Sequence, residues 1–232
     1  MQPRKTEIDT VLFDLDGTLL DTAPDLANAL NVTLERNGRN TLAYESIRPV
    51  VSYGGRALIQ LGFNIKPDHP EFEPLRLQLL DYYLNHIADQ TTLFPGMEGV
   101  LNHLEDQGTK WGIVTNKPGW LTEPLLTAVG LRSRTAVVVS GDTLKENKPH
   151  PAPLLHACKE IGGTPAHCVY VGDAERDIQA GQRAGMFTLI AMFGYIMATD
   201  QPVSWNASGI IEHPAQILDW IGSLTNRLQR EF

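Results

Sequence analysis

The sequence predicts an α/β protein that has a parallel sheet with helices on both faces and a separate helical insertion after the first strand. Two observations carry this prediction. Short apolar, β-rich runs alternate with segments of helical periodicity through most of the chain, an order typical of parallel strands joined by helical crossovers. Residues 21–92, which follow the first run, contain helical patterns but no strong strand.

The alternating elements predict a Rossmann-like core formed by residues 1–20 and 93–232. We expect strands at five apolar runs: Ile8–Phe13, Trp111–Thr115, Val137–Ser140, Val169–Gly172 and Phe187–Met192. Four helical patterns end beside a glycine, a common helix terminator: Met97–Gln107, Leu121–Val129, Pro153–Ile161 and Ala174–Ala184.

Residues 21–92 are predicted to form a helical cap mounted on the loop after the first strand. Its expected helices are Pro24–Asn37, Gly55–Leu61 and Phe72–Ala88, and Pro67 and Pro70 fall between the last two. The alternative is that these helices are ordinary crossovers of one sheet.

Composition and charge limit the kinds of molecule that this chain is expected to bind. The 232 residues are 42% hydrophobic and 20% charged, as in globular proteins, and the net charge of −8 argues against nucleic acid or an anionic membrane as the main partner. No run reaches the ~20 apolar residues of a membrane span. Two cysteines are too few for a disulfide framework and favour a reducing, cytoplasmic location. We expect a monomer or a weak homodimer.

Polar residues close several of the expected strands. These residues are Asp14 and Asp16, Thr115 and Asn116, and Asp173, while Lys148 precedes a helix after the middle strand. Because ligands of open parallel sheets bind beyond the carboxyl ends of the strands, we expect these side chains to converge at one edge.

Carboxylates gathered at one edge repel one another unless a cation compensates them. Mg²⁺ favours a few carboxylates together with waters and phosphate oxygens. The predicted protein ligands are Asp14, Asp173 and the backbone carbonyl of Asp16. The alternative for any single aspartate after a strand is a helix N-cap.

The ordered motifs Asp14-Leu15-Asp16-Gly17-Thr18-Leu19, Thr115-Asn116, Lys148-Pro149 and Gly172-Asp173 with Asp177 resemble the four-part signature of the haloacid dehalogenase-like hydrolases. The resemblance covers nearly the whole chain. It implies that Asp14 attacks phosphorus to form an aspartyl-phosphate, and that Asp16 protonates the leaving group and then activates water. A residue in the position of Asp16 distinguishes the phosphatases of this family from its dehalogenases.

The same resemblance implies the phosphate-binding residues. Thr115, the backbone N–H of Asn116 and Lys148 are expected to hold the phosphoryl oxygens, and Asp177 to orient Lys148 or a metal-bound water. Alternatives that rest on the residues alone are a helix-capping hydroxyl for Thr115 and a solvated surface lysine for Lys148.

The substrate is expected to be a small phosphomonoester, and the cap is expected to recognise the part of it beyond the phosphoryl group. The stretch Ile47–Arg56 contains paired glycines that permit close approach, and Arg48 or Arg56 could pair with a substrate carboxylate. Ser52, Tyr53 and Gly54 are further candidates. The alternative is a helix start with exposed arginines.

Two groups within the family are similar to this chain. The position of the cap and its glycine-rich stretch resemble phosphoglycolate phosphatases, whereas Trp111–Pro118, Ala157–Lys159 and Phe193–Ile196, followed by Trp205, resemble N-acetylmuramic acid 6-phosphate phosphatases. The expected substrate is therefore N-acetylmuramic acid 6-phosphate first and 2-phosphoglycolate second. Tyr195 and Trp205 could instead pack against the sheet edge.

Other classes of protein share parts of this pattern. A phosphomutase of the β-phosphoglucomutase type has all four motifs, and a phospho-accepting signalling domain has the acceptor aspartate, hydroxyl, lysine and Mg²⁺. A non-catalytic interaction platform is a third reading. The Asp16 position and the helical insertion argue against the signalling domain, and the filled polar positions argue against the platform.

Overall fold

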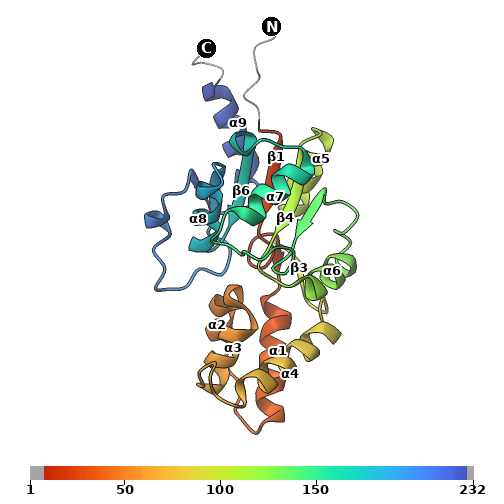
Figure 1. Cartoon of the computed structure of the whole chain (residues 1–232), viewed down its shortest axis with the longest axis vertical. Helices are drawn as coiled ribbons and strands as arrows, with labels where there is room; N and C mark the ends of the chain where they lie inside the picture. The colour runs from red at the N-terminus through yellow and green to blue at the C-terminus, as the bar shows by residue number, and fades with distance from the viewer. Residues whose placement is uncertain (1–7, 229–232) are drawn as a thin grey trace.

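The chain folds around a six-stranded parallel sheet that lies in the end of the molecule farther from the inserted helices (Figure 1). The computed structural model describes residues 8–228, so residues 1–7 and 229–232, which we assigned to the core, lie outside the described part. In sheet order the strands are β5 (Val137–Val139), β4 (Lys110–Val114), β1 (Thr10–Phe13), β6 (Cys168–Gly172), β7 (Phe187–Ala191) and β8 (Gly209–Ile211). All five predicted strands are present; β8, only three residues long, was not predicted.

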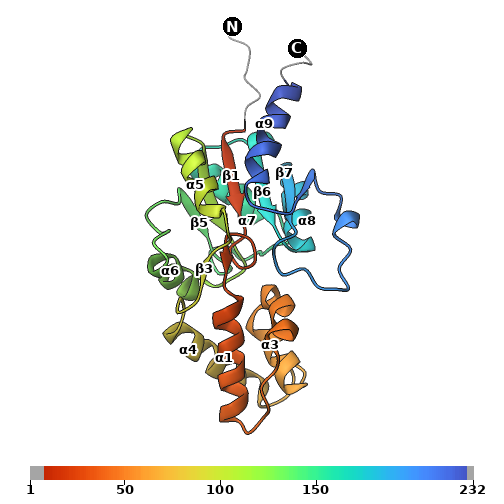
Figure 2. The same cartoon turned by 180° about the vertical axis from the view of Figure 1, so that it is seen from behind.

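Helices cover both faces of the sheet, as the two opposite views show (Figures 1 and 2). On one face α7 (Ala152–Ile161) packs on β4 and β5, and α8 (Glu175–Arg183) packs on β6 and β7. On the other, α5 (Met97–Asp106) contacts β4 and α9 (Gln216–Leu228) contacts β8. The predicted fold class is confirmed, and α6 (Gly119–Ala128) follows β4 toward the inserted helices.

The insertion after the first strand is helical, as predicted. It comprises α1 (Ala23–Arg36), α2 (Tyr44–Ile47), the 3₁₀ helix η1 (Arg48–Tyr53), α3 (Gly54–Phe63) and α4 (Phe72–Asn85). Its two ends are joined by an unpredicted antiparallel pair, β2 (Leu20–Asp21) and β3 (Thr92–Leu93). We call these helices the cap.

The two connections of the cap are also tied together by Asp25. Its carboxylate accepts hydrogen bonds from the backbone N–H groups of Gln90 and Thr91 and from the Thr91 hydroxyl, at 2.7–3.1 Å. The chain therefore leaves and re-enters the core at one place.

Strand register places the polar strand ends side by side. β1 is buried along its whole length, which explains its continuous apolar sequence. Phe13 at its end is paired with Ile113 of β4 and Val171 of β6. The residues that follow these three strands therefore emerge next to one another, toward the cap.

Both cysteines pack inside the core. Cys158 and Cys168 are buried, with their sulfur atoms 3.5 Å apart. Among the residues that the structure describes, no helix combines the length and apolar character needed to cross a membrane.

Candidate active site

Asp14, the first residue after β1, lies buried at the centre of the site. Its side chain is fixed from two directions: the backbone N–H of Leu15 donates to Oδ1 at 2.7 Å, and Lys148 Nζ lies 2.8 Å from the same oxygen. The other carboxylate oxygen makes no hydrogen bond within residues 8–228. Asp14 also lines the cavity described below.

Lys148 is a buried cation enclosed by oxygen atoms. Its Nζ lies 2.8 Å from Asp14 Oδ1 and 2.8 Å from Asp177 Oδ1, and it donates toward the Val114 carbonyl at 2.9 Å and the Tyr170 hydroxyl at 2.7 Å. Its side chain is 1% exposed, so the alternative of a solvated surface lysine is wrong. The position of its ammonium next to Asp14 suits it to balance negative charge there.

Three carboxylates form a cluster at this point. One oxygen each from Asp14, Asp173 and Asp177 lies within 4.8 Å of the others, and all three residues are buried. Burial is the largest influence on two of them, and neighbouring aspartates add to it: the pKa of Asp14 is raised to about 6 and that of Asp173 to about 7. Carboxylates this close together fit a hard divalent cation, whose charge would offset their repulsion.

The carboxylates of this cluster are not equivalent. Asp177 already accepts Lys148 and the backbone N–H of Ala174, the latter at 3.1 Å. These contacts engage both oxygens of Asp177, whereas Asp14 Oδ2 makes no hydrogen bond within the described residues and Asp173 Oδ1 accepts only the Thr18 hydroxyl, at 3.5 Å. The predicted metal ligands, which are Asp14, Asp173 and the backbone carbonyl of Asp16, stay a prediction.

Asp173 is also where the cap touches the core. Its Oδ2 accepts the Ser52 hydroxyl of η1 at 2.8 Å and the backbone N–H of Tyr195 at 2.9 Å. Ser52, predicted as a substrate-binding residue, is thus placed at the cavity edge and bonded to the core.

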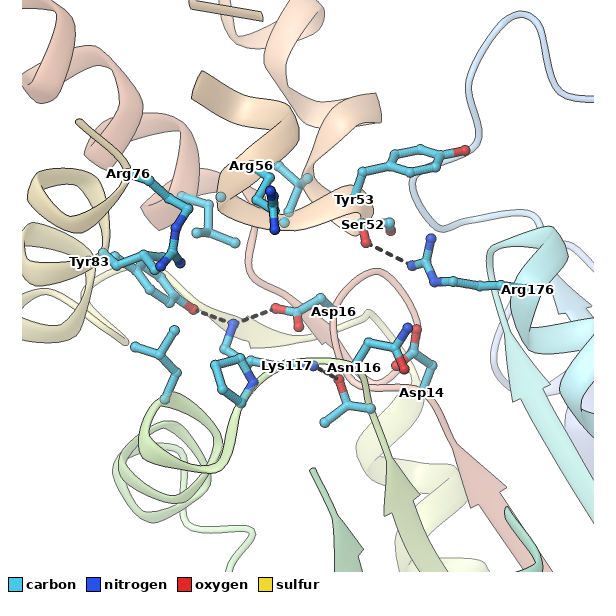
Figure 3. A pocket seen from close by; sticks show the side chains of 18 residues that line it. Asp14, Asp16, Ser52, Tyr53, Arg56, Arg76, Tyr83, Asn116, Lys117 and Arg176 are labelled. Atoms are coloured by element: carbon cyan, nitrogen blue, oxygen red, sulfur yellow. Dashed lines mark hydrogen bonds and ion pairs between the residues drawn. The ribbon is translucent and has the colours of Figure 1, made fainter. Parts of the chain in front are cut away.

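Asp16 lines the cavity, and one oxygen of its carboxylate makes all of its side-chain contacts within the described residues. Its Oδ1 accepts the Thr22 hydroxyl at 2.7 Å and Lys117 Nζ at 2.9 Å, and the same Nζ contacts the Tyr83 hydroxyl of the cap at 3.1 Å (Figure 3). Burial by itself would lower the pKa of Lys117, but Asp16 and Tyr83 outweigh it and raise that pKa. Burial raises the pKa of Tyr83 to about 12 against the opposing effect of Lys117. Both groups therefore hold their protons at neutral pH.

Thr115 and Asn116 follow β4 as predicted and line the cavity. The Thr115 oxygen accepts the backbone N–H of Lys117 at 3.1 Å. The Asn116 side chain contacts the backbone of Lys148, a role that sequence reasoning did not predict.

Arg176 is a site residue that sequence reasoning missed, although it directly precedes Asp177. Its Nη2 donates to the Ser52 carbonyl at 2.7 Å, and its Cζ lies 5.4 Å from the centre of the Tyr53 ring (Figure 3). Its Nε is buried without a hydrogen-bond partner among the described residues. Lys117 was missed as well. In both cases the available signal was a cation next to a motif residue, which is Asp177 for Arg176 and Asn116 for Lys117.

A cavity of about 400 Å³ separates the cap from the strand ends. Core residues on its wall include Asp14, Asp16, Thr115, Asn116, Lys117 and Arg176, and cap residues include Ser52, Tyr53, Gly54, Arg56, Arg76 and Tyr83. Gly54 has φ +74°, a conformation that favours glycine, at the junction of η1 and α3.

Arg48 is placed differently from the prediction. Its Nη1 and Nη2 donate to the carbonyls of Gly194 and Phe193, each at 3.0 Å, and its Cζ lies 4.9 Å from the Tyr195 ring centre. It is not among the cavity-lining residues, because its donors are used to attach the cap to the core. The burial of Tyr195 and Trp205 likewise supports the packing alternative for both.

Comparison with known proteins decides the family. A family model described as haloacid dehalogenase-like hydrolase matches residues 11–191. The chain belongs to this family of hydrolases. The match begins within β1 and ends with β7, so it includes Asp14, Thr115, Lys148, Asp173 and the whole cap.

Individual relatives span nearly the whole chain. A phosphoglycolate phosphatase of Xanthomonas campestris is 45% identical over 89% of this chain and 93% of the relative. An N-acetylmuramic acid 6-phosphate phosphatase of Pseudomonas aeruginosa is 38% identical over 93% of this chain and 96% of the relative. The crystal structure of a predicted phosphoglycolate phosphatase from Haemophilus somnus superposes with a TM-score of 0.82 at 28% identity, covering 94% of this chain and 99% of that one.

Proposed function

We propose that this chain, a phosphatase of the haloacid dehalogenase-like superfamily, hydrolyses a small carboxylated phosphate ester through an aspartyl-phosphate on Asp14. The observation that carries the proposal is the meeting of a buried, Lys148-paired Asp14 with Asp16 and Thr115 on the wall of one cavity. The names of the relatives support a phosphomonoester as the substrate.

Asp14 is the proposed nucleophile. Its Oδ1 is held by Leu15 and Lys148, so Oδ2 is the oxygen available to attack phosphorus. Asp14 and Asp173 would hold Mg²⁺, which supplies charge neutralisation between the attacking carboxylate and the phosphate. Lys148 balances part of the remaining negative charge.

Asp16 is the proposed general acid and base. As the ester P–O bond breaks, Asp16 gives a proton to the leaving oxygen, and it later takes a proton from the water that attacks phosphorus and releases Asp14. Thr115 and the backbone N–H of Asn116 are the proposed partners of the phosphoryl oxygens, whose charge increases in the transition state.

The size and charge of the cavity bear on the substrate. Its volume of about 400 Å³ is in the range of sites that enclose whole small molecules, about 300–1,000 Å³, and is more than a two-carbon acid requires. The cap contributes Arg56 and Arg76, which point from the cap toward Asp16 and Lys117 in Figure 3. Because Arg76 is already paired with Glu73, Arg56 is the better partner for a substrate carboxylate. We therefore propose N-acetylmuramic acid 6-phosphate as the first substrate.

2-Phosphoglycolate is the second candidate, favoured by the 45% identity to a relative of that name. The deciding experiment measures kcat/KM with Mg²⁺ for N-acetylmuramic acid 6-phosphate, 2-phosphoglycolate and glucose 6-phosphate. We expect a preference of about a hundredfold for the muramic ester; a comparable preference for phosphoglycolate would reverse the choice. Arg56→Gln is expected to lower activity on the two carboxylated esters but not on glucose 6-phosphate, and so to reduce the preference for the muramic ester over glucose 6-phosphate.

The same assay separates the proposal from its alternatives. A phosphomutase would isomerise a sugar phosphate without net release of phosphate, and a signalling domain would be labelled once without multiple turnover. Asp14→Asn should abolish turnover while the circular dichroism spectrum is retained. Substantial residual turnover in this variant would place the nucleophile elsewhere.

A further inference from the structure

Lys117 is a buried cation at the boundary between cap and core. It lies in the loop after β4, its side chain is 7% exposed, and its Nζ joins Asp16 of the core to Tyr83 of the cap at 2.9 and 3.1 Å. The Nζ also lies 4.7 Å from the centre of the Tyr83 ring. One ammonium group therefore contacts both the carboxylate of Asp16 and a cap side chain.

The contacts to Asp16 leave one of its oxygens unoccupied. Lys117 and Thr22 both donate to Oδ1, whereas Oδ2 accepts no hydrogen bond from residues 8–228. Because Asp16 lines the cavity, Oδ2 is the oxygen placed to exchange a proton with a substrate there. Two donors on Oδ1 restrict the rotation of the carboxylate and keep Oδ2 in that orientation.

Lys117 bridges Tyr83 and Asp16. The Tyr83 ring is fully buried in α4, and its hydroxyl bonds to Lys117 within the described chain. Without that hydroxyl, Lys117 keeps its charge but loses the acceptor that orients it from the cap side.

We infer that Lys117 is a positioning residue for Asp16 and that Tyr83 acts through Lys117, so that contact with the cap completes the orientation of the proton donor. This inference rests on the proposed function, in which Asp16 carries the proton. Lys117 exchanges no proton: in the first half-reaction the proton passes from Asp16 Oδ2 to the leaving oxygen, and in the second it returns to Asp16 from water.

The test compares two leaving groups. A nitrophenolate leaves without needing a proton, whereas an alkoxide needs one. We therefore expect Lys117→Met to slow release of the alcohol from an alkyl phosphate ester in the first turnover by about ten- to a hundredfold. General acid catalysis usually contributes about 10²–10⁴-fold. First-turnover release from p-nitrophenyl phosphate should change little, and Asp16→Asn should show the same split. Lys117→Arg should recover part of the loss.

A second measurement tests the connection through Tyr83. Tyr83→Phe alone should reduce alkyl-ester turnover, but in the Lys117→Met background it should cost nothing further, because two residues acting in series are not additive. Affinity for inorganic phosphate with Mg²⁺ should be unchanged in Tyr83→Phe and Lys117→Arg, which keep the charges of the site; this measurement also reports folding. If Lys117→Met misfolds, Tyr83→Phe and Lys117→Arg still test the leaving-group split.

Two results would overturn the inference. Equal losses for both leaving groups would mean that Lys117 acts on the phosphoryl group itself, and independent, multiplying losses would mean that Tyr83 does not act through Lys117. Neither result affects the proposed function, which fails instead if Asp14→Asn remains active.

Discussion

The side-chain amide of Asn116 binds the backbone of Lys148 at both of its polar atoms. Nδ2 donates to the Lys148 carbonyl at 3.0 Å, and Oδ1 accepts the Lys148 N–H at 3.1 Å. The residues lie 32 positions apart in the chain, so this pair connects the end of β4 to the loop that presents the buried ammonium.

Loss of this pair should affect both stability and rate. Asn116→Ala removes two hydrogen bonds, each worth about 0.5–1.5 kcal/mol, and frees the Lys148 loop. We expect the free energy of unfolding to fall by about 1–3 kcal/mol in urea denaturation and kcat to fall with it. Asn147→Ala, at an exposed neighbour, is the control; equal effects in both variants would contradict the prediction.

Gly17 should not tolerate a side chain. Its φ is +85°, and a Cβ there would lie 2.2 Å from Asp173 Oδ2. Gly17→Ala is expected to lower stability by about 1–3 kcal/mol through backbone strain and to weaken Mg²⁺ binding by displacing Asp173. The control is Gly99→Ala in α5, where nothing lies within 4 Å; it should stabilise by about 0.5–1 kcal/mol. Thermal melts and calorimetric Mg²⁺ titration would show both effects.

Arg176 should hold the cap against the core. Arg176→Gln removes the bond to the Ser52 carbonyl and the contact with the Tyr53 ring, so the cap should separate more often. A hydrogen bond from a charged group is worth about 1.5–3 kcal/mol, which predicts an increase of about tenfold or more in amide exchange. The measurement is hydrogen exchange over residues 48–56. Arg132→Gln, at an exposed arginine paired with Glu123, should leave that exchange unchanged.

Metal binding should stabilise the fold more as pH rises. The pKa values of Asp14 and Asp173, about 6 and about 7, lie above their ordinary value of 3.8 because of burial first and repulsion by nearby carboxylates second, Asp177 for both groups and Asp14 for Asp173. In metal-free protein these groups favour folding below about pH 4, and that contribution is lost as pH rises through 6 to 7. Mg²⁺ takes the place of the protons, so the increase in Tm on adding it should be larger at pH 8 than at pH 5. An equal increase at both values would remove these carboxylates from the metal site.

Much of the fold follows from local patterns in the sequence. The apolar runs mark five of the six strands of the parallel sheet, because a parallel strand covered on both faces is apolar along its length. The β2–β3 pair escaped prediction because strands of two residues carry too little periodicity. β8 is as short as β5, but β5 is three consecutive valines, whereas β8 begins with a glycine and has only two apolar residues.

The sequence by itself determined that polar residues close several strands, and the rule that parallel strands end at one edge predicted that Asp14, Thr115 and Asp173 meet there. Only the tertiary structure decided what contacts them: Arg48 binds backbone carbonyls instead of lining the cavity, and Lys117 joins Asp16 to Tyr83. The physical reason is how far apart in the sequence the interacting residues lie. Strand ends follow from short stretches of chain, whereas Lys117 and Asp16 are 101 positions apart and meet through the packing of β1 against β4, and Tyr83 reaches them only because the cap folds back over the sheet edge.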